Sequence, residues 1–208
     1  MTSPKVLFLP MLFCLSCLFV ISPKAHGADT PPTDFIKSVV DNVFHTLNMY
    51  PVAGPQENLP KRRAKIKEII DENFDAEEMA KRALGKYWKA QPVEKQQEFT
   101  KLFYWRLYNF YILRVETYSD EKVMYKKELL KGDIAGVHTL ISSKKYPEFD
   151  IEYRVRKADE SWKIYDVVIE GVSLVANYRS QFGNFLSKKT FDELLRELRA
   201  KNEENNLR

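Results

Sequence analysis

Cysteine, histidine and glycine are scarce in this chain of 208 residues, and each shortage disfavours a class of function. Both cysteines, Cys14 and Cys17, fall in the first 27 residues, so the remainder offers no disulfide, thiolate nucleophile or cysteine-held metal. The downstream histidines, His45 and His138, have no partner at metal-ligand spacing. The seven glycines form no phosphate-binding loop, and no nucleophile elbow is present. We therefore expect no metal and no cofactor.

The N-terminus has the pattern of a secretory signal peptide over residues 1–27. A single basic residue, Lys5, precedes the almost unbroken apolar run Val6–Ile21, and Ala25–Gly27 places small residues at the −3 and −1 positions. We expect cleavage before Ala28, which leaves one domain over residues 28–208. A membrane anchor is the alternative, but the run is short and a cleavage site follows it.

A strong excess of charge is also missing. Loss of two lysines with the signal peptide would lower the net charge from +4 to +2, which is too weak to indicate a nucleic-acid partner. The basic run from Lys61 to Lys67, with Arg62 and Arg63 on its outer side, is interpreted as a solvated helix face. Contact with anionic lipid or an acidic partner is the alternative for that run.

Apolar spacing predicts three helices in the first third of the downstream chain. The first is capped by Thr33 and has an apolar stripe that begins at Phe35. The basic helix follows a proline-rich loop. The third begins at a capping box formed by Asp75 and Glu78 and ends near Gly85.

A long helix is predicted from Pro92 to about Tyr118, and it is apolar nearly all round. Such a helix must be covered on several sides or must line a cavity. The chain has 13 Phe and 11 Tyr, which fits either an unusually bulky core or a ligand cavity, and composition does not separate the two. Two further helices are expected at the end, capped by Ser173 and by Thr190 with Glu193.

Between these helices, apolar and polar residues alternate in four segments, namely Val123–Tyr125, Gly136–Ser142, Phe149–Arg156 and Trp162–Ile169. Short polar connections join them, which predicts an antiparallel meander. The fold class is therefore α+β, with a four-stranded antiparallel curved sheet packed against several helices and an apolar cavity between them.

Tyr165 and Asp166 are the most enzyme-like pair, because a Tyr donor and an Asp base can act together in an apolar pocket. Adjacent residues of a strand point to opposite faces, however, so both reach one pocket only across a bulge. A structural Tyr and an Asp bonded to backbone are favoured, and we assign no catalytic residue.

Two stretches resemble a known family. The sequences FDAEEMAKRALGKYW at 74–88 and WKIYDVVIEGVSLVANYRSQF at 162–182, with the long helix that begins near Pro92, are similar to the MlaC family of periplasmic phospholipid-binding proteins. The resemblance covers nearly the whole chain after the signal peptide. A sister branch of hopanoid-associated proteins shares much of this pattern, which leaves the lipid open.

The resemblance implies a soluble, non-enzymatic carrier located in the periplasm. It would move phospholipid between an outer-membrane lipoprotein–porin complex and an inner-membrane ABC transporter that carries an MCE-domain protein. The sequence leaves the oligomeric state open, and we expect a monomer. An enzyme that uses Tyr165 or Asp166, and an adaptor whose aromatic residues form a partner-binding surface, remain as alternatives.

Strand alternation and helical spacing indicate which side chains would contact the lipid tails. We place Tyr178 and Arg179 at the mouth, where Arg179 could meet the phosphate, with a surface salt bridge as the alternative. The predicted tail contacts are Phe103, Leu107, Tyr111, Val137, Ile141, Ile151, Tyr153, Tyr165, Val167, Val172, Leu174 and Phe182.

Overall fold

The computed structural model describes residues 30–52, 54–118, 121–143 and 147–206. The predicted signal peptide and its cleavage site lie outside these ranges. Among the described helices, none combines the length and apolar character that a bilayer span requires. The helices are α1 (Pro32–Met49), α2 (Asn58–Asn73), α3 (Ala76–Leu84), α4 (Val93–Glu116), α5 (Leu174–Leu186) and α6 (Phe191–Asn206), with a 3-10 turn at Gly85–Tyr87.

The sheet is antiparallel, with strands in the order β1-β2-β3-β4-β5. The α+β fold is thus confirmed, but the predicted number of four strands was wrong. The fifth strand has only two residues and pairs with the end of β4. A strand so short carries no alternation that a sequence pattern could reveal. The strands are β1 (Lys122–Lys131), β2 (Ile134–Ser142), β3 (Phe149–Ala158), β4 (Ser161–Ile169) and β5 (Val172–Ser173).

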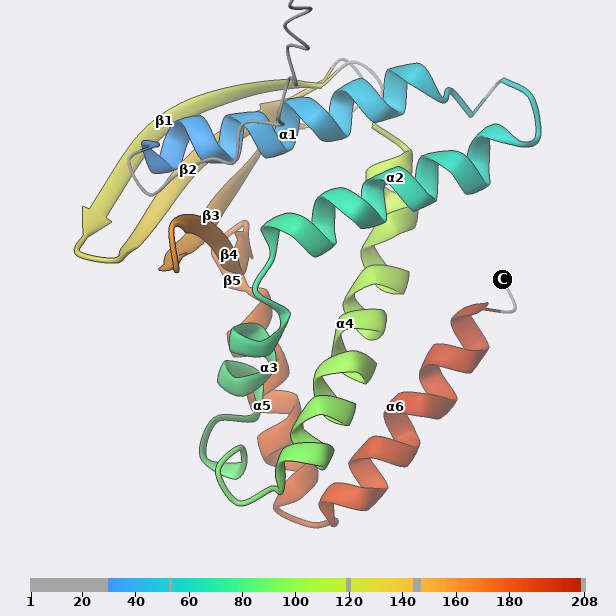
Figure 1. Ribbon diagram of the computed structural model, residues 1–208, viewed down its shortest axis with the longest axis vertical. Helices are drawn as coiled ribbons and strands as arrows, with labels where there is room; N and C mark the ends of the chain where they lie inside the picture. The colour runs from blue at the N-terminus through green and yellow to red at the C-terminus, as the bar shows by residue number, and fades with distance from the viewer. Residues whose placement is uncertain (1–29, 53, 119–120, 144–146, 207–208) are drawn as a thin grey trace, which may run out of the picture.

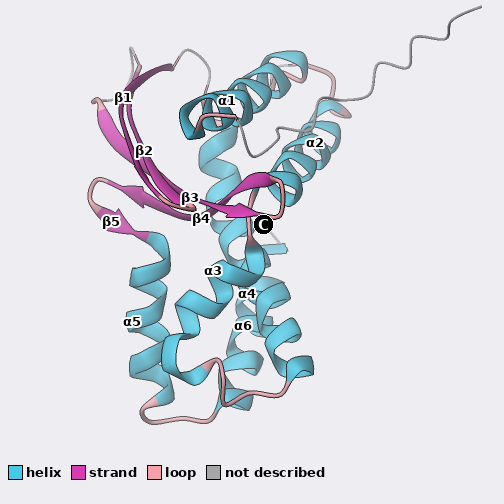
Figure 2. Ribbon diagram, turned by 60° about the vertical axis from the view of Figure 1, so that its left-hand side comes forward, coloured by secondary structure: helices cyan, strands magenta, loops and turns pink. Residues whose placement is uncertain are grey.

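The sheet and the helices pack as two connected parts (Figure 1). In the upper part, α1 lies along one face of the curved sheet and α2 crosses below it. Figure 2 shows α5 descending from β5 into the lower part, which contains α3, α5, α6 and the first half of α4. The second half of α4 rises toward α2 and the sheet, so this helix belongs to both parts.

Aromatic rings fill the core of the lower part. Phe99 and Phe103 of α4 are almost fully buried and stack with their ring centroids 5.7 Å apart. Tyr178 and Phe182 of α5 meet them edge-on at 5.0 to 5.6 Å, and Phe191 of α6 completes the cluster. Such offset and edge-to-face pairs are favoured by the ring quadrupole. Part of the aromatic content is therefore packed core.

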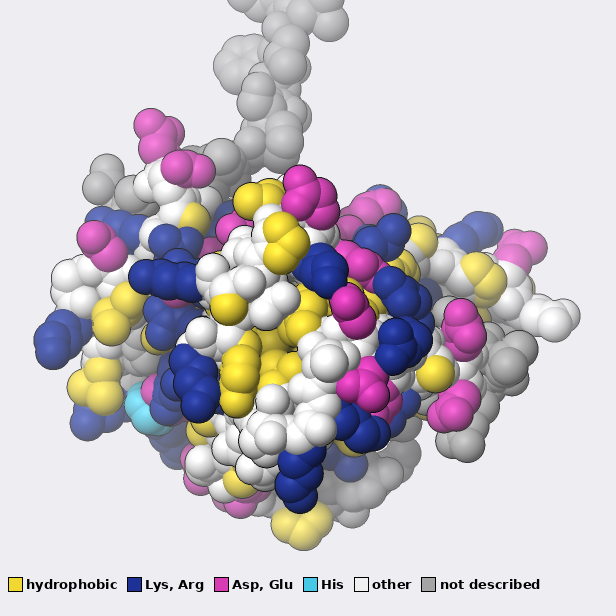
Figure 3. All heavy atoms as spheres, turned by 90° about the horizontal axis from the view of Figure 1, so that it is seen from below, with side chains coloured by type: hydrophobic (Ala, Val, Ile, Leu, Met, Phe, Trp, Pro, Cys, Tyr) yellow, Lys and Arg dark blue, Asp and Glu magenta, His cyan; other side chains and the backbone are white. Residues whose placement is uncertain are grey.

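The lower end of the molecule presents a mixed surface (Figure 3). Hydrophobic side chains gather in a hollow at the centre of this face, and basic and acidic side chains surround them. The apolar surface at this end is thus bordered by charge.

The predicted helix caps were correct at the last two helices. The Ser173 hydroxyl accepts from the Ala176 amide, and Thr190 and Glu193 form a reciprocal capping box. The prediction for Thr33 was wrong, because α1 begins at Pro32 and the Thr33 hydroxyl instead bonds Glu128 of β1.

The capping box at Asp75 is only half formed. Asp75 accepts from the Glu78 amide, but the Glu78 carboxylate pairs with Lys81 and Arg82. The Asp75 amide instead donates to the Ile164 carbonyl, which joins α3 to β4.

The basic run of α2 differs from its predicted role at Arg62, which is only 2% exposed. Its guanidinium donates to the backbone carbonyl of Glu116 at 2.6 Å, at the C-terminal end of α4, where helix carbonyls lack intrahelical partners. Arg63 binds the Glu116 carboxylate through two nitrogens, at 2.8 and 3.0 Å. These two arginines thus tie α2 to the end of α4.

Candidate functional site

An apolar cavity of about 260 Å³ lies between the sheet, α1, α2 and the second half of α4. Apart from the hydroxyls of five tyrosines and the side chain of Arg114, the side chains of its wall are apolar. It is lined by Val39, Val40, Val43, Phe44, Ile66, Ile70, Phe74, Ala76, Met79, Phe103, Tyr104, Leu107, Tyr108, Tyr111, Ile112, Arg114, Val115, Tyr118, Val123, Ile141, Ile151, Tyr153, Ile164, Val167, Ile169 and Leu174.

Two regular patterns build this wall. On α4, Phe103, Leu107, Tyr111 and Val115 recur every fourth residue and so form one stripe along the helix. On the strands, the lining residues occupy one face because side chains alternate, and antiparallel register brings them side by side. Tyr153 of β3, for example, is opposite Val167 of β4, and Ile151 is opposite Ile169.

Burial moves the pKa of the tyrosine hydroxyls in the wall still further above neutral pH. The pKa of Tyr153 is raised strongly, mainly because removal from water disfavours the phenolate. Burial likewise raises the pKa of Tyr108 and Tyr111. The tyrosine wall therefore carries no charge at neutral pH, as an apolar ligand requires. The aromatic residues of the chain are thus divided between the cavity wall and the packed core.

Eight of the fourteen predicted site residues line this cavity. Whether they touch a ligand remains a prediction, but the structure brings them together around one space. They are Phe103, Leu107, Tyr111, Ile141, Ile151, Tyr153, Val167 and Leu174.

The other six predicted residues do not line the cavity. Val137 packs beneath α1 in the sheet core with no exposed surface, and Val172 of β5 is 55% exposed. Tyr165, Tyr178 and Phe182 belong to the core of the lower helices.

The sixth of these residues, Arg179, does not stand at the cavity mouth. Its Nε donates to the Arg82 carbonyl at 2.7 Å, and its alkyl stem lies 3.6 Å from where a Cβ would stand on Gly85. Gly85 has φ +55°, in the left-handed region that favours glycine, and it ends α3 as predicted. Arg179 therefore fastens α5 to the end of α3.

A β-bulge explains why Tyr165 and Asp166 share one face. Arg154 of β3 pairs with Asp166 and the next residue, Val155, pairs with Ile164, so Tyr165 is the extra residue. Both side chains are buried, but neither lines the cavity. The Asp166 carboxylate accepts from the Val175 amide at 3.1 Å and from the Ser173 hydroxyl at 2.6 Å. Asp166 thus holds the start of α5, in the backbone-bonded role that the sequence favoured.

Asp166→Ala should therefore lower stability and leave ligand content unchanged. The substitution removes a helix-capping acceptor and leaves a buried amide without a partner, which costs about 2–3 kcal/mol. Urea unfolding measures this loss, and Asp192→Ala, which removes an exposed carboxylate paired with Lys95 at 2.6 Å, should cost much less. A loss of bound ligand from folded Asp166→Ala protein would contradict this purely structural role.

Several cavity residues escaped prediction. The apolar stripe of α1 was recognised, but strand and helix periodicity do not say which element a stripe will face. Val39, Val43 and the inward isoleucines of α2 therefore looked like ordinary core. Tyr104 and Tyr108 also line the cavity. The apolar character of α4 on nearly all its faces is the sequence feature that could have indicated them.

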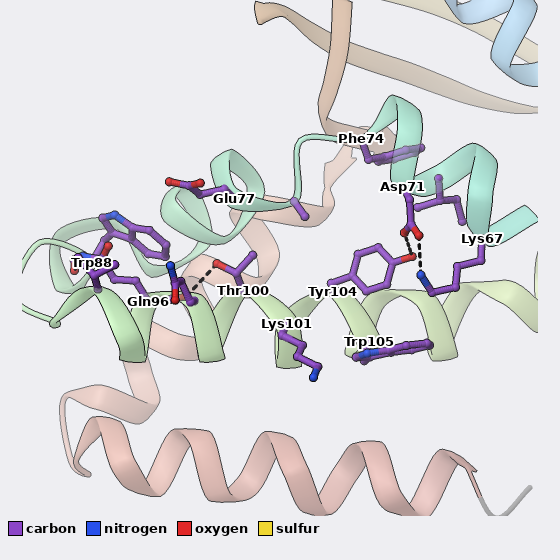
Figure 4. Close-up of a pocket in the computed structure, with 14 residues that line it drawn as sticks. Lys67, Asp71, Phe74, Glu77, Trp88, Gln96, Thr100, Lys101, Tyr104 and Trp105 are labelled. Carbon is purple, nitrogen blue, oxygen red and sulfur yellow. Dashed lines mark hydrogen bonds and ion pairs between the residues drawn. The ribbon is translucent and has the colours of Figure 1, made fainter.

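A second hollow of about 580 Å³ lies between α2, α3 and α4 (Figure 4). Charged and polar side chains, among them Asp71, Lys67 and Lys101, are prominent in its lining. The Tyr104 hydroxyl and the Lys67 ammonium each approach the Asp71 carboxylate to 2.5 Å. Tyr104 lines both hollows, so this trio stands where the second hollow meets the apolar cavity.

Within residues 30–52, 54–118, 121–143 and 147–206, no group of His, Cys, Asp or Glu side chains is placed so that it could hold a metal ion. The apolar cavity is the candidate functional site, because eight of the fourteen predicted site residues line it.

Comparison with known proteins identifies the family. The family model described as MlaC protein matches residues 37–200, which is most of the chain. The protein belongs to the MlaC family. The intermembrane phospholipid transport system binding protein MlaC of Haemophilus influenzae is 22% identical over 200 residues, covering 92% of this chain and 90% of the relative.

A solved structure supports the MlaC fold. The phospholipid-binding protein of Ralstonia solanacearum, determined in complex with a phospholipid, superposes with a TM-score of 0.75. It is 24% identical, and the match covers 88% of this chain and 99% of that one. At this identity the likeness establishes the fold. The family predicted from the two sequence stretches is thus confirmed.

Proposed function

We propose that this MlaC-family protein is a periplasmic phospholipid carrier that encloses acyl chains in the apolar cavity. The observation that carries the proposal is the cavity wall, whose only charged side chain among 26 lining residues is Arg114. The phospholipid in the structurally similar Ralstonia protein and the name of the Haemophilus relative support it. The cargo is bound, not transformed, and we propose no catalytic role.

Physical chemistry explains why a carrier is needed. Two acyl chains hold about 30 methylenes, and at about 0.8 kcal/mol each their exposure to water costs roughly 24 kcal/mol. A lipid therefore does not cross an aqueous compartment unaided at a useful rate. Enclosing the tails is enough, because the headgroup can remain in water. The carrier needs an apolar wall and few polar contacts, which matches the cavity.

The partners follow from the family and form part of the proposal. The carrier would exchange lipid with an outer-membrane lipoprotein–porin complex and with an inner-membrane ABC transporter that carries an MCE-domain protein. Export by the signal peptide would place it between the two membranes, where it would act as a monomer.

Native mass spectrometry of the mature protein, residues 28–208, tests the carrier directly. The protein is purified from the periplasm without detergent, and its lipid is extracted and identified. We expect a bound mass equal to that of a diacyl phospholipid. A hopanoid mass would assign the protein to the sister branch. An empty protein that also fails to take lipid from vesicles would contradict the carrier function.

A further inference from the structure

Arg114 is the most solvent-exposed residue in the lining of the apolar cavity. It is the only lining residue with a charge, and it is also the only one that is exposed at the surface. The other lining residues are buried or half-buried. The edge of the cavity at the last turn of α4 therefore lies at the protein surface.

The immediate surroundings of Arg114 are aromatic. Tyr111 and Tyr118, three residues before and four after it, line the same cavity. The nearby guanidinium opposes the rise in pKa that burial gives to both tyrosines, so its charge lies close to their hydroxyls. Tyrosine at such a mouth presents an apolar ring inward and a wet hydroxyl outward.

The guanidinium of Arg114 is also uncommitted. In the described part of the chain it makes no ion pair and no side-chain hydrogen bond. Other arginines of the upper part differ, since Arg63 is held by Glu116 and Arg154 by Glu152 and Asp166. Arg114 is thus a cation at the mouth of a hydrocarbon pocket, with its donors available.

We propose that Arg114 binds the phosphodiester of the cargo at the mouth of the cavity and so selects anionic-phosphate lipids over neutral ones. The inference rests on the proposed carrier function and names its headgroup site. A guanidinium suits this role, because its planar donors engage two phosphate oxygens at once. With the tails enclosed by the wall, the phosphate of a diacyl lipid reaches the rim, where Arg114 stands.

The test is a competition that cancels effects on folding. Wild-type protein is equilibrated with vesicles that contain equal amounts of phosphatidylglycerol and of diacylglycerol with the same acyl chains. The ratio of the two lipids bound is then measured by mass spectrometry. Because both lipids carry the same tails, the ratio reports the headgroup alone.

Arg114→Gln should lower this ratio about tenfold, which is the usual worth of a charge-assisted hydrogen bond at a partly wet site. The matched control is Arg106→Gln, two turns earlier on α4, where the guanidinium lies over the Phe110 ring and not on the cavity. That variant should keep the wild-type ratio. Arg114→Lys should keep part of the preference, because lysine keeps the positive charge but lacks the planar donors that engage two phosphate oxygens.

An unchanged ratio in Arg114→Gln, with lipid still bound, would overturn the phosphate site and leave the carrier intact. A wild-type protein that binds neither lipid would overturn both. Inorganic phosphate alone, titrated by calorimetry, separates the two sources of a phosphate group. Binding of free phosphate that Arg114→Gln removes, with no change in the lipid ratio, would overturn the headgroup assignment.

Discussion

Val167→Asp should empty the cavity of lipid while the protein remains folded. Val167 lines the cavity from β4 and is only half-buried. The new carboxylate can be hydrated when no lipid is present, but tails cannot enter without displacing that water. To be neutral at pH 7, an aspartate of pKa about 3.9 must take up a proton at a cost of about 4 kcal/mol, so affinity should fall about 1000-fold.

The same variant should recover at low pH. Protonation becomes easier as the pH falls, so at pH 5 the loss should shrink to about tenfold. The matched control is Val172→Asp on the neighbouring strand, where the side chain is 55% exposed and does not line the cavity. Lipid extraction and a thermal melt are measured on each variant. Val167→Asp protein that retains its lipid at pH 7 would show that β4 does not form a binding wall.

Glu116→Ala should produce the largest loss of stability among single charge changes. The side chain of Glu116 is only 8% exposed, pairs with Arg63 and lies near the charge of buried Arg62. Burial lowers the pKa of Arg62, and the Glu116 carboxylate opposes that change. Removing the anion leaves buried positive charge unpaired, which costs about 3–4 kcal/mol in the free energy of unfolding.

Urea unfolding measures this effect, with Glu197→Ala as the control. Glu197 forms an exposed ion pair with Lys201 on α6, and such pairs contribute less than about 1 kcal/mol. A double-mutant cycle with Arg63→Ala isolates the pair itself. Equal losses from Glu116→Ala and Glu197→Ala would show that the tie between α2 and α4 is not a stabilising contact.

Most of the elements could be predicted because local signals are strong in this chain. Alternation located β2, β3 and β4, and the hydroxyl caps at Ser173 and Thr190 located the starts of α5 and α6. The stripe of Phe103, Leu107 and Tyr111 follows from helical spacing alone. These signals depend on neighbours within a few residues, which a sequence displays directly.

The remaining features depend on contacts between distant residues. The bulge at Tyr165 shifts the register of β4 against β3, so simple alternation assigned that side chain to the wrong face. Arg62 is buried because the end of α4, more than fifty residues away, offers a carbonyl. Arg114 was left out of the predicted site because its role depends on where the cavity opens, which only the packing of α1, α2 and the sheet decides.

Because α4 belongs to both parts of the molecule, its first half is fixed in the lower core and its second half projects from that core. Its first half is clamped, since Phe99 and Phe103 are buried in the aromatic core and the Leu102 carbonyl accepts from Asn202 of α6. Its second half extends about 20 Å beyond Phe103, with Phe110 and Leu113 more than half exposed on the outer side.

A tilt of about 6° at Phe103, where α4 leaves the lower core, would move the C-terminal end of α4 by about 2 Å, given that length. The hydrogen bond from Arg62 to the C-terminal end of α4 would make α2 move with it, so the two helices would shift together. At about 260 Å³ the cavity is near the lower limit for enclosing a small ligand, and a diacyl lipid requires more room. This joint movement of α2 and the second half of α4 would provide that room, while the aromatic core around the first half of α4 stays unchanged.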